Sequence, residues 1–176
     1  MADDESEGID VAPAPGVGFG LVKRWRRLSE AAQDRVVGGV LALPSGAVLG
    51  IARWLSPAAE GVGTHKQLGL SGCTVLTATG WPCPMCGMTT TFSHLAHLEV
   101  GAAALTQPFG VVLFSATLAA FALGTSDLIR PRRRWVRALR TLEPFEVHLA
   151  IGLLAGMALG WGYKVIAMGI VTPFGA

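Results

Sequence analysis

The sequence predicts an all-α integral membrane protein with three transmembrane helices and one short helix that is re-entrant or lies at the membrane interface. Of its 176 residues, 51% are hydrophobic and only 15% are charged, whereas a typical soluble domain carries about 25% charged residues. The mean hydropathy is correspondingly high, at +0.49. Three apolar stretches also come close to the roughly 20 residues that an α-helix needs to cross the hydrocarbon core of a bilayer.

The predicted spans lie within a membrane domain at 36–171, at about 36–55, 109–129 and 147–171. Pro44 is expected to kink the first span. If these stretches were core helices of a soluble protein, the rest of the chain would be too short to cover them. The pattern therefore favours transmembrane helices.

Charge is distributed unevenly along the chain. Residues 1–20 hold five acids and no base and are expected to form a disordered acidic tail, while 21–35 is expected to form a basic interfacial helix. Six arginines crowd into the loop at 130–146, whereas the Cys loop at 56–108 holds one base, Lys66. The positive-inside rule then places the N-terminus and the Arg-rich loop in the cytoplasm, and the Cys loop and C-terminus on the outer face.

Polar residues near the ends of the spans fit an interfacial role. Trp161, Tyr163 and Lys164 lie near the outer end of the third span, where amphipathic aromatics and a snorkelling lysine act as anchors. Asp127 is expected to pair with Arg130 or to lie among the lipid headgroups. The arginines of 130–146 either bind anionic headgroups or only determine topology, and they require no nucleic-acid partner.

All three cysteines and two of the four histidines fall within residues 73–97 of the Cys loop, with the spacing Cys73-x9-Cys83-x2-Cys86-x7-His94-x2-His97. Pro84 is well suited to the first position of a helix, which would make Cys83 the N-cap and put Cys86 in the first turn. The helix dipole there favours a thiolate. The chain from Phe92 to about Leu105 is then expected to be the short re-entrant or interfacial helix.

Three interpretations of these residues are open. Cys73, Cys83, Cys86, His94 and His97 are candidate metal ligands, with zinc as the candidate cofactor, although the His-x2-His spacing is shorter than usual. Alternatively, Cys83 and Cys86 form a structural or redox-active disulfide, or one of them pairs with Cys73, which the outside of a bacterial membrane permits. In the third interpretation the cysteines only pack a tight turn.

The segment GCTVLTATGWPCPMCGMTTTF, followed by QPFG and an apolar span, resembles a widespread bacterial membrane-protein domain of unknown function. The residues that match its signature are Cys73, Thr79, Gly80, Cys83, Pro84, Cys86, Gly87, Met88, Thr89, Gln107 and Pro108. The resemblance implies a bacterial membrane protein of two to four helices, with no established reaction. Many members carry Arg where this chain has Thr90. The histidine pair lies outside the signature, which favours the three cysteines acting together.

No arrangement of residues indicates catalysis: the sequence has no Ser/His/Asp pattern, no phosphate-binding loop and no paired intramembrane carboxylates. The function that it favours is a non-catalytic accessory or scaffolding subunit in the bacterial plasma membrane. Its partner would be another membrane protein or a second copy of the chain. Gly152, Gly156 and Gly160 could serve that contact or pack internally. The alternative is a membrane thiol-redox or metal-binding protein that uses the CPMCG loop.

Overall fold

The computed structural model describes residues 28–171, and all regular structure within them is helical. Three of these helices are long and apolar enough to cross a membrane, namely α2 (Glu30–Trp54), α6 (Pro108–Ile129) and α8 (Glu146–Val171). The predicted all-α fold with three membrane-spanning helices is thus confirmed. The acidic tail at 1–20 and residues 21–27 of the predicted basic segment lie outside the described residues. The rest of that segment leads into α2, which begins at Glu30.

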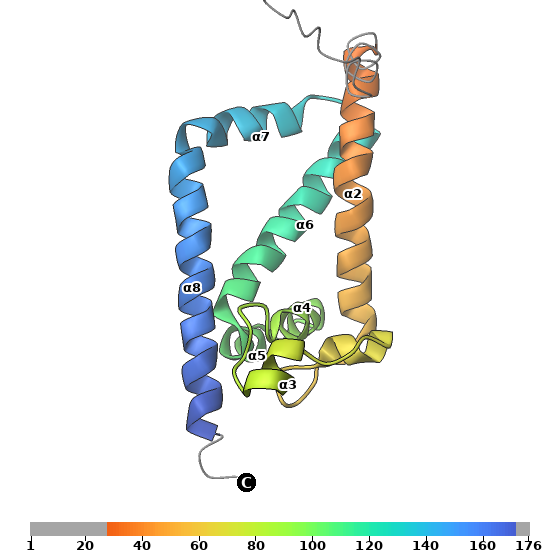
Figure 1. Ribbon diagram of the computed structural model, residues 1–176. Helices are drawn as coiled ribbons and strands as arrows, with labels where there is room; N and C mark the ends of the chain where they lie inside the picture. The colour runs from red at the N-terminus through yellow and green to blue at the C-terminus, as the bar shows by residue number, and fades with distance from the viewer. Residues whose placement is uncertain (1–27, 172–176) are drawn as a thin grey trace, which may run out of the picture.

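The three long helices run between two ends of the molecule (Figure 1). At one end, α7 crosses from the end of α6 to the start of α8. The opposite end carries the Cys loop. The short elements are α7 (Arg134–Leu142) and η2 (Glu143–Phe145) at the first end, and η1 (Thr64–Leu68), α3 (Thr74–Thr79), α4 (Met88–Ala96) and α5 (Val100–Thr106) in the Cys loop. We call these two ends the α7 end and the Cys-loop end.

Helices α2 and α6 pack backbone against backbone. A Cβ atom added to Gly38 would lie 2.7 Å from the carbonyl oxygen of Gly124, and one added to Gly124 would lie 2.7 Å from the backbone nitrogen of Ala42. Only small residues permit such an approach between membrane helices. Helix α2 runs through Pro44 as one element, so the expected kink does not divide this span.

Two buried carboxylates from different spans hold the start of α7. Asp34 accepts hydrogen bonds from the backbone N–H of Arg133, at 2.9 Å, and from the indole N–H of Trp135, at 3.1 Å. Asp127 accepts from the backbone N–H of Trp135 at 3.1 Å and is fully buried. The predicted pairing of Asp127 with Arg130, or its exposure to headgroups, is therefore wrong. The backbone N–H of Trp135, in the first turn of α7, binds its carboxylate instead.

Helix α8 meets the other spans only in its half nearer the Cys loop. Cβ atoms added to Gly156 and Gly160 would lie 2.9 Å from atoms of Phe109 in α6, whereas Gly152 has open space beside it. Every residue from 146 to 155 is exposed within the described part of the chain. The glycine stripe thus packs internally at two positions and leaves the third open.

Candidate metal centre in the Cys loop

The fold brings the three cysteines together. Cys73 is the N-cap of α3, while Cys83 and Cys86 lie in the turn before α4. Their three sulfur atoms lie within 4.8 Å of one another, and the Sγ atoms of Cys83 and Cys86 are 3.4 Å apart. Cys86 is buried and the other two are half-buried. The cluster therefore joins two segments that are ten residues apart in the sequence.

The turn that carries Cys83 and Cys86 is not yet helical, which corrects the expected helix start at Pro84. It closes through hydrogen bonds from the N–H of Cys86 to the carbonyl of Cys83, at 2.9 Å, and from that of Met88 to Met85, at 3.1 Å. Helix α4 begins at Met88 after Gly87, whose φ is +87°. This left-handed conformation, which favours glycine, separates the turn from the helix. Cys83 is thus not an N-cap.

Gly87 is also the point at which α8 approaches the cluster. A Cβ atom added there would lie 3.0 Å from the carbonyl oxygen of Gly61 and 3.1 Å from the Nζ atom of Lys164. Lys164 is only 5% exposed, and its ammonium donates to the carbonyls of Gly61 and Thr106, each at 3.1 Å. It is close enough to Cys86 to interact with it electrostatically. The predicted role of Lys164 as a snorkelling anchor is wrong, because its charge turns into the Cys loop.

Two aromatic residues of α8 likewise bind the Cys loop. The indole N–H of Trp161 donates to the carbonyl of Pro82 at 2.8 Å, and the hydroxyl of Tyr163 donates to that of Leu105 at 2.7 Å. The amide of buried Gln107 reaches the carbonyl of Pro84 at 3.4 Å. The loop is therefore fastened to α8 on both sides of the cysteine turn.

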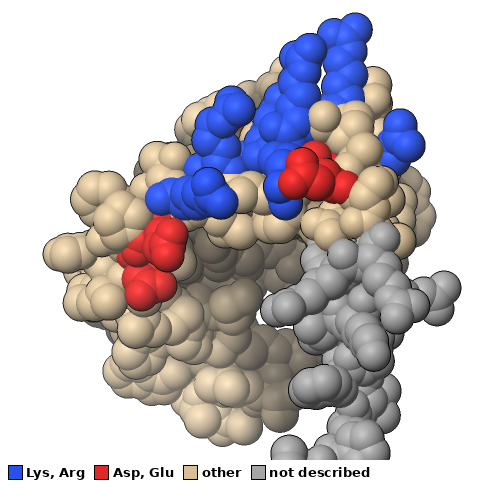
Figure 2. Space-filling model, turned by 90° about the horizontal axis from the view of Figure 1, so that it is seen from above, with Lys and Arg blue, Asp and Glu red and all other residues tan. Residues whose placement is uncertain are grey.

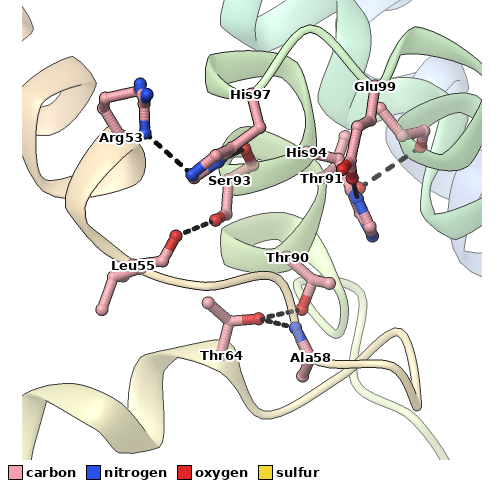
Figure 3. A network of polar contacts seen from close by, with 11 residues as sticks. Arg53, Leu55, Ala58, Thr64, Thr90, Thr91, Ser93, His94, His97 and Glu99 are labelled. Carbon is pink, nitrogen blue, oxygen red and sulfur yellow. Dashed lines mark hydrogen bonds and ion pairs between the residues drawn. The ribbon is translucent and has the colours of Figure 1, made fainter.

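The two predicted histidine ligands lie on α4 or at its end and have other partners (Figure 3). His97 Nε2 lies 2.9 Å from the guanidinium of Arg53, and its Nδ1 lies 2.8 Å from the carbonyl of Ser93. Since arginine can only donate, Nε2 accepts and Nδ1 donates, which leaves no ring lone pair for a metal. His94 pairs with Glu99 at 2.6 Å. Neither histidine belongs to the group of potential metal ligands that the described residues form.

Buried hydroxyls hold α4 against the chain that precedes the cluster, as Figure 3 also shows. The hydroxyls of Thr90 and Thr64 are 2.8 Å apart, and Thr64 also accepts from the backbone N–H of Ala58 at 3.0 Å. The hydroxyl of Ser93 donates to the carbonyl of Leu55. Thr90 is 1% exposed, so its hydroxyl makes a tightly packed polar contact.

The three cysteines line a pocket of about 290 Å³, and His65 and Lys66 line it as well. Both residues come from the 3-10 helix η1. The imidazole Nε2 of His65 lies 3.1 Å from the carbonyl of Ser71. Sequence reasoning missed His65 because its distance from the cysteines along the chain gives no metal-ligand spacing. Its place beside them follows from the fold of the loop.

The thiols of Cys73 and Cys86 differ in their electrostatic surroundings. The backbone N–H of Leu76, with help from the thiols of Cys83 and Cys86, lowers the pKa of Cys73 to about 7, against the opposing effect of burial. Burial is the main cause that raises the pKa of Cys86 to about 12, and the neighbouring Cys83 adds to it. Of Cys73 and Cys86, Cys73 is therefore the thiol that ionises first as the pH rises.

Comparison with known proteins identifies the segment that contains the cluster. Residues 73–121 match the family model described as "Protein of unknown function (DUF2752)". The match begins at Cys73 and extends into α6, so it contains all three cysteines. Neither the curated proteins nor the solved structures contain a match to the chain. Residues 73–121 are therefore similar to the DUF2752 family of proteins of unknown function, and the cysteine cluster lies within the matched segment.

Proposed function

We propose that this chain is a non-catalytic membrane subunit whose Cys loop binds one zinc ion through Cys73, Cys83 and Cys86. The observation that carries the proposal is the convergence of the three sulfurs within 4.8 Å. Zn–S bonds are about 2.3 Å long, and two sulfurs of a tetrahedral site are then about 3.8 Å apart. The cluster comes close to that spacing, so small shifts of the side chains are enough to seat an ion.

A bound ion would tie the start of α3 to the turn before α4. A site with three protein ligands keeps one position open, and the pocket beside the thiols has room for water or another fourth ligand. Three thiolates and Zn²⁺ together carry one negative charge. The buried ammonium of Lys164, which interacts electrostatically with Cys86, would offset that charge.

The test is elemental analysis of the full chain purified anaerobically in detergent. We expect about one zinc per chain, lost in Cys73→Ser and in Cys83→Ser but kept in His97→Ala, a matched control whose imidazole is already occupied. The thiols should resist alkylation until a chelator removes the metal. Zinc-free protein, or zinc that survives both serine variants, would overturn the proposal.

The second candidate function is thiol–disulfide chemistry at Cys83 and Cys86. It is favoured by their Sγ separation of 3.4 Å, from which a modest rotation of the side chains reaches the S–S bond length of about 2.05 Å. In this case the purified protein would lack metal. Its Cys83 and Cys86 would escape alkylation until dithiothreitol is added, while Cys73 would be alkylated throughout.

We further propose that the protein lies in the bacterial plasma membrane with its Cys loop on the outer face. The support is the asymmetry of charge, since six arginines lie at 130–146 and one base lies in the Cys loop. Its partner would be another membrane protein or a second copy. The exposed apolar half of α8, with open space beside Gly152, is the surface that suits such an assembly.

A further inference from the structure

The α7 end carries a second site, far from the cysteines and independent of the proposed zinc centre. Figure 2 looks down on this end and shows basic side chains gathered in a band, with acidic side chains at two places beside them and the surface hollowed next to the band. Four arginines of this end line one pocket of about 360 Å³ together with Val136 and Thr141; they are Arg132, Arg133, Arg137 and Arg140. No acidic residue of the described part of the chain lines that pocket.

Three of these arginines have no carboxylate partner among residues 28–171. Arg133 already has carboxylate partners, since its guanidinium donates to Glu30 at 2.7 Å and lies 4.0 Å from Asp34. None of the ion pairs among residues 28–171 involves Arg132, Arg137 or Arg140, and all three are exposed. Guanidinium groups gathered in this way suit the oxygens of a phosphate, to which each can donate two parallel hydrogen bonds.

The apolar side of α7 faces a second, larger pocket. This pocket of about 550 Å³ lies in the corner between α7 and α8. Its apolar lining includes Trp135, Val136 and Leu139 of α7 and Leu149 of α8. Arg133 and Arg140 line this corner as well as the basic pocket, so the two pockets are neighbours. Glu143 and Glu146 line only the corner, at the junction of α7 with α8.

We propose that the α7 end binds one anionic phospholipid, with its phosphate on Arg132, Arg137 and Arg140 and its acyl chains in the corner between α7 and α8. Charge complementarity selects an anionic headgroup over a zwitterionic one. The corner selects a lipid over a free phosphate, because its apolar lining needs hydrocarbon to cover it. The helix α7 lies across the spans (Figure 1), as an amphipathic helix at an interface does.

The experiment is native mass spectrometry of the full chain in mixed micelles that contain equal amounts of dioleoyl-phosphatidylglycerol and dioleoyl-phosphatidylcholine. We expect one phosphatidylglycerol to be retained in preference. The variant R132Q/R137Q/R140Q should lose that preference by about tenfold or more. The matched control R35Q/R130Q/R134Q removes the same charge at the same end but touches neither pocket, and it should keep the preference.

A second pair of variants tests the acyl chains. Leu149→Trp fills the corner and should lower retention of phosphatidylglycerol, whereas Leu153→Trp, on the same helix but outside the corner, should not. Equal retention of the two lipids would show no preference for an anionic headgroup, and equal losses in the two triple variants would show general charge attraction only. Either result would overturn the site. Equal effects of the two tryptophan variants would overturn the placement of the chains. Unchanged thermal unfolding in lipid-free detergent checks that each variant is folded.

Discussion

At the scale of single residues, the thiols of one cluster differ because their backbone surroundings differ. The N–H of Leu76 favours the thiolate of Cys73 and lowers its pKa from 9.0 to about 7. The burial of Cys86 disfavours its thiolate and raises its pKa to about 12. A cluster with one easily ionised thiol has an entry point for a metal ion, since the thiolate is the form that binds it.

The first prediction is that Cys73 of the metal-free, reduced protein reacts with iodoacetamide as a thiolate near neutral pH. Because its pKa is lowered, its labelling rate should rise as the pH passes through about 7, whereas Cys86 should stay unreactive up to about pH 9. Peptide mass spectrometry after timed labelling, over a series of pH values, measures both. A rate for Cys73 that rises only near its ordinary value of 9.0 would contradict the prediction.

The second prediction concerns Lys164. Lys164→Met keeps most of the aliphatic chain but leaves the carbonyls of Gly61 and Thr106 without the ammonium that binds them. Each buried polar group left unpaired costs about 1–3 kcal/mol. Thermal unfolding in detergent should occur at a clearly lower temperature, and protease should cut the Cys loop sooner. Tyr163→Phe, which removes one exposed hydrogen bond, should have the smaller effect. If the two variants behave alike, Lys164 does not fasten the loop.

At the scale of elements, the contact of α2 with α6 depends on two glycines. A Cβ atom at Gly38 would meet the backbone of Gly124 at 2.7 Å, while one at the adjacent Gly39 would meet nothing within 4 Å. Gly38→Ala should therefore destabilise the protein by about 1–3 kcal/mol through overpacking. Gly39→Ala should be neutral or slightly stabilising, because alanine favours a helix. Urea unfolding in detergent compares them, and effects of the same sign would refute this packing.

The elements show what local pattern can and cannot predict. The long apolar stretches predict all three spans because the requirement of about 20 apolar residues is local. The start of α4 was predicted four residues too early because Pro84 suits a first helical position, while the turn that ends at Gly87 depends on its fit against Gly61 and Lys164. The buried position of Asp127 depends on α7 folding back onto α6, which no local pattern reveals.

At the scale of the whole molecule, sequence spacing identified the cysteines but not their surroundings. Cys73 and Cys83 are far enough apart that only the fold of the loop brings them together. The sequence around Lys164 is compatible with a side chain that snorkels outward and with one that turns inward, so it does not predict the direction. What decides its direction is that Gly61 and Thr106 present carbonyls beside it. The interpretation that joined the histidines to the cysteines in one site also depends on the fold, and α4 places His94 and His97 beside other partners.

The whole-molecule prediction is the orientation in the membrane. Since α7 and the Cys loop lie at opposite ends (Figure 1), reporters attached to them must lie on opposite sides of the bilayer. The arginines of 130–146 should keep the α7 end in the cytoplasm. Alkaline phosphatase needs disulfides that form only outside the cytoplasm, so a fusion at residue 62 should be active and one at residue 135 inactive. A green fluorescent protein reporter at the same sites should give the reverse pattern. Activity at residue 135 alone would invert the orientation, and equal activity at both sites would contradict the passage of α6 through the membrane.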